Sequence, residues 1–296
     1  MARTRAEKLE FGGPWTHVKL AALESYLPAY TTILKRNPRA KHLSTMYVDA
    51  FAGSGRMDYA PSKQAQLFEA SKQPYLKGSA ARALEVTPEF DKYIFIESKK
   101  SRCEELQKLK QKFPQKEQRI DVHNEDANTF LMKWCTATDW TKWRAVVLLD
   151  PFAMNVAWKT VEALARTHAV DMWWLFPCGA FNRLLTKGKK PPPKWSAALT
   201  RICGTNEWEE RFYRASEQPG LFGSIHSEDK TAGFEIINQF LRERLATVFA
   251  GVVDRPLFLV NSNNSPMFML FFAASNPRGA VPAVKIANWV IQHSGN

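Results

Sequence analysis

Short apolar runs alternate with helix-like patterns along most of the chain. Runs of strand length, rich in branched and aromatic side chains, fall at residues 46–49, 93–97, 119–123, 144–149 and 170–176. Apolar residues at helical spacing predict amphipathic helices at residues 17–34, 78–84, 101–113 and 129–135. Strands that alternate with helices build a parallel sheet covered on both faces, so the pattern predicts an α/β fold.

The last third of the chain completes this pattern. A helix is expected over residues 233–249, an antiparallel strand pair at residues 257–260 and 268–273, and a final helix over residues 281–291. At the other end, Thr16 is expected to cap the first helix. The basic residues on the helix at 101–113, among them Arg102, indicate a solvated face.

The first strand ends at Asp49 and breaks into a glycine turn. Ala52, Gly53 and Gly55 leave room for a ligand near the backbone, because glycine has no Cβ and adopts positive φ. Open α/β sheets present such turns to nucleotide-like ligands. Ser79 is a candidate N-cap of the next helix, whose N-terminus either offers N–H groups to an anionic ligand group or is an ordinary capped helix end.

Carboxylates follow two further strands. Glu97 stands where an acidic side chain in a nucleotide-binding sheet accepts hydrogen bonds from the ribose hydroxyls. Asp126, past the third strand, either accepts a hydrogen bond from an adenine amino group or caps the following helix. Both interpretations remain open from the sequence.

The fourth strand exits into Asp150, Pro151 and Phe152. A carboxylate, a turn carbonyl and an aromatic face at the carboxyl edge of the sheet suit an exocyclic amine on a flat base. The alternative is a plain exit from the strand, since proline often follows one. Together with the glycine turn and Glu97, the pattern favours a site.

Composition and charge indicate which kinds of binding partner to expect. A chain of 296 residues that is 45% hydrophobic can bury a full core, and its formal charge of +12 indicates an anionic partner, nucleic acid (DNA or RNA) being the commonest. A generically basic, solvated surface is the alternative. The four cysteines lie far apart without metal-ligand spacing, which predicts reduced thiols, no metal site and a cytoplasmic protein. We expect no signal peptide and no membrane-spanning segment.

Three regions are expected. Residues 1–185 form the core with its N-terminal helix, residues 186–232 a basic loop and a helical insertion, and residues 233–296 the C-terminal completion of the core. A further stretch, residues 56–77, lacks any sustained periodicity of apolar residues and looks like an insertion after the glycine turn. The basic loop and its neighbours supply candidate substrate contacts: Asn182, Arg183, Lys189, Lys190 and Trp195.

These blocks resemble the class I S-adenosylmethionine-dependent methyltransferases, and more narrowly the three-Cys-motif partner family. The narrower resemblance rests on FGGPWT at residues 11–16, YVDAFAGSG at 47–55, DPFAM at 150–154, WLFP at 174–177 and NRLL at 182–185. It implies a Rossmann-like sheet of seven strands, with helices on both faces and a small helical cap. It also implies a partner protein that carries a three-cysteine motif, of the radical S-adenosylmethionine type.

The resemblance further implies S-adenosylmethionine as the cofactor. Lys19 matches a lysine on the N-terminal helix that approaches the cofactor carboxylate in related base methyltransferases. Asp150, Pro151 and Phe152 take the place of the amino-methyltransferase catalytic motif. The residues assigned to the cofactor are Lys19, Asp49, Phe51, Ala52, Gly53, Gly55, Ser79, Glu97, Asp126 and Ala127.

Three hypotheses for the function follow. The first is methyl transfer from S-adenosylmethionine to an amine of a nucleic acid base or nucleotide. The second is a catalytically weak, S-adenosylmethionine-binding subunit of a three-cysteine protein, because the amine motif usually has two prolines before its aromatic residue and one of them is missing or replaced here. A nicotinamide oxidoreductase is disfavoured, because Asp58 occupies the third position of the dinucleotide-binding fingerprint.

Overall fold

The computed structural model describes residues 14–55, 77–187, 190–220, 223–230 and 233–294. Its helices are α1 (Pro14–Arg36), α2 (Ser79–Leu84), α3 (Lys100–Gln111), α4 (Ala127–Ala137), α5 (Trp158–Arg166), α6 (Cys178–Leu184), α7 (Pro193–Cys203), α8 (Trp208–Phe212), α9 (Phe234–Ala246) and α10 (Ala280–His293), with short 3₁₀ turns at Pro38–Ala40 and Pro114–Arg119. Its strands are β1 (Ser44–Asp49), β2 (Lys92–Ile96), β3 (Ile120–His123), β4 (Trp143–Leu149), β5 (Val170–Phe176), β6 (Tyr213–Gly220), β7 (Gly223–Lys230), β8 (Gly251–Val252), β9 (Leu257–Val260) and β10 (Pro266–Ala274).

The described strands form one large sheet and one separate hairpin. The large sheet has the order β3-β2-β1-β4-β5-β10-β8, with β9 also paired to β10. The strands from β3 to β5 run parallel, and β10 runs antiparallel to β5. The predicted Rossmann-like α/β class is confirmed. The sheet has eight strands rather than the predicted seven.

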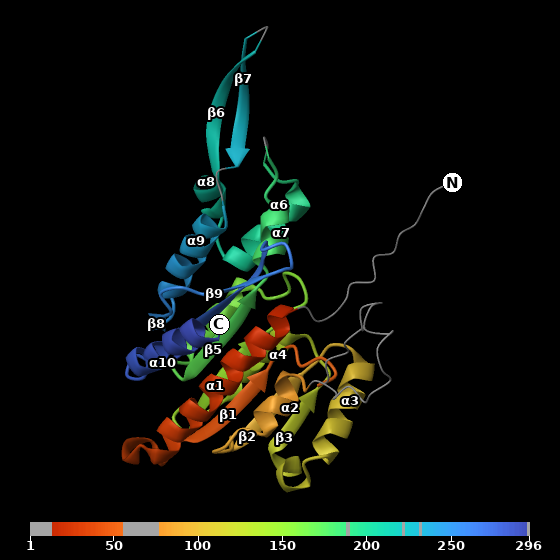
Figure 1. Cartoon of the computed structure of the whole chain (residues 1–296), viewed down its shortest axis with the longest axis vertical. Helices are drawn as coiled ribbons and strands as arrows, with labels where there is room; N and C mark the ends of the chain where they lie inside the picture. Colours follow the sequence, from red (N-terminus) through yellow and green to blue (C-terminus); the bar gives the residue numbers. More distant parts are fainter. Residues whose placement is uncertain (1–13, 56–76, 188–189, 221–222, 231–232, 295–296) are drawn as a thin grey trace, which may run out of the picture.

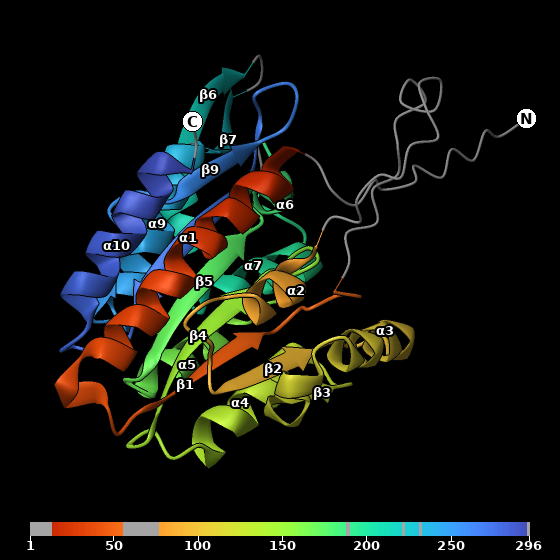
Figure 2. The ribbon, with the colours of Figure 1, turned by 60° about the horizontal axis from the view of Figure 1, so that its bottom comes forward.

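Side chains that alternate along each strand divide the core into two layers. Trp173 of β5 packs with the layer under α1, α2 and α10, whereas Trp174 packs with the layer under α4 to α9. Successive residues of a strand point to opposite faces, so a fully apolar strand such as β5 must be covered on both sides. Figure 2 shows α1 and α10 lying side by side across one face of the sheet.

The insertion differs from its predicted helical form. After α7 and the short α8, residues 213–220 and 223–230 pair as the antiparallel strands β6 and β7, which project from the body of the protein (Figure 1). These strands contain glycine, proline, aspartate and glutamate, which are depleted in strands, so the sequence does not predict them. The glycines that flank the turn, Gly220 and Gly223, are the signal that could have indicated a hairpin.

Two predicted helix caps are also wrong. Helix α1 begins at Pro14, so Thr16 lies inside it; proline suits the first turn because that turn needs no N–H donor. Helix α2 has Gly78 as its N-cap, and Ser79 is its first residue. The Ser79 hydroxyl is therefore available for a different contact, which is described below.

The four cysteines are buried and free, as predicted for reduced thiols. Burial raises the pKa of Cys135 and of Cys178 to about 12, which keeps both thiols protonated at neutral pH. Over the described residues, no helix is long and apolar enough to cross a membrane.

Asp171 is a buried carboxyl group in the middle of the fold. It lies in β5, is 8% exposed, and accepts a 2.7 Å hydrogen bond from the Tyr26 hydroxyl of α1. Burial raises its pKa from the ordinary 3.8 to about 7, and the Tyr26 hydrogen bond and the charge of Arg144 oppose this rise. The folded protein therefore holds a proton here that the unfolded chain releases at lower pH.

This proton makes stability depend on pH. Because the folded pKa is raised, Asp171 contributes stability below pH 4, and this contribution is lost as the pH rises towards 7. Asp171→Asn should be near neutral at pH 4 and should stabilise the protein at pH 8 by up to about 4 kcal/mol relative to the wild type. Urea unfolding at both pH values measures this, with Asp121→Asn as control. An equal effect of Asp171→Asn at both pH values would contradict the prediction.

Candidate functional site

The candidate site lies at the carboxyl ends of three neighbouring parallel strands. Strand β1 lies between β2 and β4, and Asp49 stands in register with Phe95 and Leu148. The chain therefore leaves all three strands at one edge of the sheet, and Asp49, Glu97 and Asp150 mark the exits. Figure 2 shows the N-terminal end of α1 and helix α6 at this edge.

Asp49 is fully buried and holds the glycine turn in place. Its carboxylate accepts a 3.3 Å hydrogen bond from the Phe51 N–H and a 2.5 Å bond from the Ser79 hydroxyl. Burial raises the pKa of Asp49 to about 6, the Ser79 bond opposes this, and the nearby Asp150 charge adds to it. Asp49 thus ties β1, the turn and α2 together. Its direct contact with a ligand stays a prediction.

The two glycines of the turn have different surroundings. Both have positive φ, +60° at Gly53 and +71° at Gly55, as the sequence predicts. A Cβ on Gly55 would meet the Leu109 Cδ2 atom of α3 at 2.8 Å, whereas no atom of the described residues lies within 4 Å of one on Gly53. Gly55 is therefore needed for packing, and Gly53 faces the open space that a ligand would need.

Backbone hydrogen bonds join the turn to its neighbours. The buried Ala52 donates its N–H to the Ile96 carbonyl of β2 at 3.0 Å. The Gly78 N–H donates to the Gly55 carbonyl at 3.2 Å, so the chain returns beside the turn after residues 56–76. The predicted insertion at 56–77 lies almost wholly outside the described residues. Phe51 is partly buried against the core on the α4–α9 side of the sheet.

Glu97 follows β2 and is 7% exposed. One carboxylate oxygen accepts a 2.8 Å hydrogen bond from the Lys99 N–H, and the other lies 3.7 Å from a guanidinium nitrogen of Arg102. The Arg102 side chain is 36% exposed, and Lys108 on the same helix is 61% exposed, so the helix face is largely solvated, as predicted. Asn124, which the sequence analysis missed, donates 2.9 Å bonds to the carbonyls of Glu97 and Ser98 and so joins the exits of β2 and β3.

Asp126 caps helix α4. Its carboxylate accepts hydrogen bonds from the N–H and the hydroxyl of Thr129, at 3.0 and 3.2 Å. The capping interpretation is therefore confirmed, while a contact with adenine stays a prediction. Ala127 is the buried first residue of α4.

The exit from β4 is the most distinctive part of the site. Asp150 forms an ion pair with Lys19 of α1, and the two side chains are only 22% and 9% exposed. Pro151 is buried, whereas Phe152 is 55% exposed. Ala153 has a φ of +57°, which is unusual for a residue other than glycine. A buried cation, a carboxylate and an exposed aromatic ring thus lie in succession at the sheet edge.

The predicted substrate residues lie on α6, α7 and the segment between them. Asn182 is partly buried and Arg183 is exposed on α6, which directly follows β5. Lys190 forms a 3.3 Å ion pair with Glu209 of α8, and Trp195 of α7 is 39% exposed. Lys189 lies outside the described residues. The roles of these side chains in substrate binding stay predictions.

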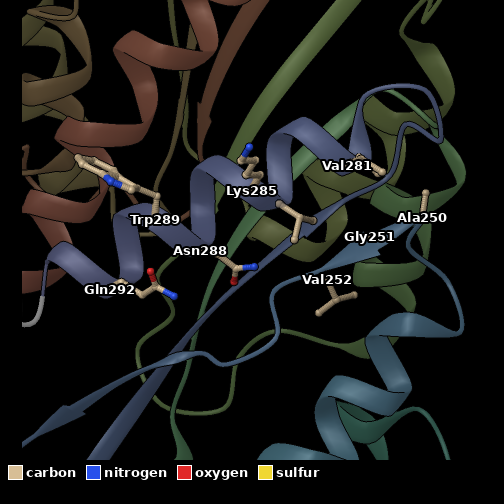
Figure 3. A pocket seen from close by; sticks show the side chains of 10 residues that line it. Ala250, Gly251, Val252, Val281, Lys285, Asn288, Trp289 and Gln292 are labelled. Carbon is tan, nitrogen blue, oxygen red and sulfur yellow. The ribbon is translucent and has the colours of Figure 1, made fainter.

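Two cavities lie elsewhere in the fold. One, of about 530 Å³, lies between α10 and β8 and is lined by Val252, Lys285 and Trp289 among others (Figure 3). The other, of about 570 Å³, adjoins it near Asp254 and Phe258. Neither is lined by a residue predicted for the site. In the described part of the chain, no group of three or more His, Cys, Asp or Glu side chains is arranged to hold a metal ion.

No protein-family model matches the chain, and no curated protein matches its sequence. Among solved structures, the chain is similar to protein LPL1258 from Legionella pneumophila. The identity is 11% and the TM-score 0.50, and the match covers 95% of this chain and 92% of that one. This likeness is one of fold.

Two further solved structures have lower scores. Spermidine synthase from Thermotoga maritima is 11% identical with a TM-score of 0.38, over 89% of this chain and 60% of that one. Magnesium protoporphyrin IX methyltransferase from Synechocystis, solved with bound S-adenosylmethionine, is 11% identical with a TM-score of 0.31, over 72% and 77% of the two chains.

Proposed function

We propose that this protein transfers a methyl group from S-adenosylmethionine to an amine nitrogen of a nucleic acid base or nucleotide. The observation that carries the proposal is the exit from β4, where Asp150 is followed by the buried Pro151 and the exposed Phe152. This exit adjoins the glycine turn and Glu97 at one sheet edge, where ligands bind in open α/β folds.

The residues beside the turn fit the cofactor. Gly53 leaves open space where a Cβ would otherwise project, so a ligand can approach the backbone closely. Glu97 is held by the Lys99 N–H and Arg102, and a carboxylate retains further lone pairs for two ribose hydroxyls. When bound, S-adenosylmethionine supplies an electrophilic methyl group on a positively charged sulfur.

The β4 exit would orient the amine. The Asp150 carboxylate and the Pro151 carbonyl can accept the two N–H bonds of an exocyclic amine, while Phe152 stacks on the flat base. This arrangement directs the nitrogen lone pair by position rather than by a strong base. Asp150 is also exposed enough, at 22%, to pass a proton from the methylated nitrogen to water.

The charge of the chain supports a polymeric substrate. The formal charge is +12, and the basic segment before α7 leads to the exposed Trp195. Lysines bind phosphates, and exposed aromatic rings stack on unpaired bases. DNA and RNA both meet this description.

The ion pair of Asp150 with Lys19 supports a second candidate. Lys19 occupies the carboxylate that would otherwise accept hydrogen bonds from the amine. In addition, the amine motif at residues 150–152 has a single proline. A protein of this kind binds S-adenosylmethionine without efficient transfer and acts as the partner subunit of a three-cysteine protein.

Two measurements test the proposal. Calorimetry should detect binding of S-adenosylmethionine and none of NAD; no heat with S-adenosylmethionine would refute both candidates. Cofactor with a labelled methyl group should then label genomic DNA, total tRNA or rRNA. Binding without labelling of any of the three would favour the partner subunit.

Glu97→Gln should weaken the binding of S-adenosylmethionine. The amide keeps the size of the side chain but loses the charge that strengthens hydrogen bonds from the ribose hydroxyls, so we expect a loss of roughly tenfold or more in affinity. The matched control is Glu89→Gln, which removes a carboxylate paired with Arg119 and Lys116 before β2, at the opposite edge of the sheet. Equal affinity of the Glu97 variant and the wild type in calorimetry would exclude Glu97 from the cofactor site.

A further inference from the structure

The loop that carries Phe152 is held by side chains from two helices. Asn128 of α4 donates to the Asn155 carbonyl at 2.8 Å and accepts from the Ala157 N–H at 2.9 Å. From the other side, a guanidinium nitrogen of Arg201 donates to the Met154 carbonyl at 2.6 Å. The loop between β4 and α5 is therefore bonded to α4 and to α7, which belongs to the insertion at 186–232.

The direction of the Phe152 ring depends on this backbone. The ring is 55% exposed, so the loop backbone contributes to its placement. The next residue, Ala153, has a φ of +57°, a conformation that persists only where neighbouring contacts enforce it. Met154, one residue further, is 7% exposed and supplies the carbonyl that Arg201 binds. A charge-assisted hydrogen bond to this carbonyl fixes the peptide plane between Met154 and Asn155, directly after Ala153 and Met154 in the same loop.

We propose that Arg201 is a positioning residue. Through its hydrogen bond to the Met154 carbonyl, it holds the Phe152 loop in the geometry that methyl transfer needs. The inference rests on the proposed methyl transfer, and it gives the insertion a part in the reaction besides contact with substrate. Arg201 does not touch the reacting atoms. Its effect is on the orientation of the base, and a small misplacement of a reacting group lowers the rate strongly.

The chain offers a matched control. Arg242 of α9 is also exposed, also lies on a helix, and also donates to a backbone carbonyl, that of Asp254, at 3.1 Å. Asp254 lines the cavity beside α10 and belongs to no predicted part of the site. Arg242→Met therefore removes a similar bond without touching the loop.

The first test needs no activity. Hydrogen–deuterium exchange, followed by mass spectrometry over residues 152–157, should be at least severalfold faster in Arg201→Met than in the wild type, and unchanged in Arg242→Met. Arg201→Lys keeps the charge and one donor, and should give an intermediate rate. Equal exchange in Arg201→Met and the wild type would overturn the inference.

The second test measures transfer to whichever nucleic acid the wild type labels. Arg201→Met should lower kcat by roughly tenfold to a hundredfold, while KM for S-adenosylmethionine stays unchanged. Arg201→Lys should recover part of the lost kcat, and Arg242→Met should have the kcat of the wild type. Faster exchange with unchanged kcat would show that the bond holds the loop but does not serve transfer, which also overturns the inference. If the wild type transfers no methyl group, the proposed function fails, and the exchange rates alone decide whether Arg201 holds the loop.

Discussion

Asp150→Ala should lower methyl transfer by roughly 100-fold or more, because it removes the group that would accept an N–H bond from the amine. A 100-fold loss corresponds to about 2.7 kcal/mol of transition-state stabilisation. The amide of Asp150→Asn still accepts one hydrogen bond through its oxygen, so that variant should retain much of the activity. Binding of S-adenosylmethionine should persist in both, which calorimetry measures beside the labelling assay.

Loss of Asp150 also removes the partner of the buried Lys19, and an unpaired buried cation destabilises the fold. Urea unfolding of Asp150→Ala separates the two effects, because a destabilised fold lowers the free energy of unfolding whereas a lost contact with the amine does not. Asp139→Ala is the control, since Asp139 is exposed and precedes β4 at the opposite edge of the sheet. Full activity in Asp150→Ala would refute the role of Asp150 in methyl transfer.

The core of the fold follows from local patterns. The apolar run that forms β5, with Trp173 and Trp174 packed on opposite faces, predicts a strand buried on both sides, and the structure has that strand at residues 170–176. The antiparallel pairing of β9 with β10 is confirmed as well. Long apolar strands leave few alternatives, because only a sheet covered on both faces buries them.

Other elements carry too little local signal. Strand β8 has two residues, Gly251 and Val252, and is defined by pairing with β10 rather than by any pattern of its own. The hairpin at 213–230 is polar and projects from the body, so hydrophobic periodicity does not reveal it. The first error concerns a strand that only its partner β10 defines, and the second a local hairpin whose polar sequence carries no hydrophobic pattern.

The candidate site, too, could be predicted only in part from the sequence. Motif order predicts that Asp49, Glu97 and Asp150 lie at one edge of the sheet, because each follows a parallel strand. The side-chain pairings within the site, by contrast, could not be predicted. Lys19 and Asp150 are 131 residues apart, and Ser79 is 30 residues from Asp49. Pairings at such separations follow from packing in three dimensions, and a single sequence does not encode them as a local pattern.

Substitutions at the two turn glycines should separate folding from binding. Gly55→Ala places a Cβ 2.8 Å from Leu109 at a φ of +71°. The positive φ and the overpacking should together cost about 2–4 kcal/mol. Gly53→Ala meets the same backbone strain at +60°, but its Cβ meets no atom in the described part of the chain. It should cost only about 1 kcal/mol.

The two substitutions should affect the binding of S-adenosylmethionine in the reverse order, with the larger loss of affinity in Gly53→Ala. The Cβ of Gly53→Ala projects into the space assigned to the cofactor, so affinity should fall by roughly tenfold or more in a protein that remains folded, because close backbone approach is lost. Gly55→Ala should lower the midpoint of thermal unfolding by roughly 3–6 °C. Gly233→Ala is the control, since Gly233 has a φ of −90° and open space around it. Unchanged affinity in Gly53→Ala would mean that the cofactor does not lie against this turn, and that its binding site must be sought away from the exit of β1.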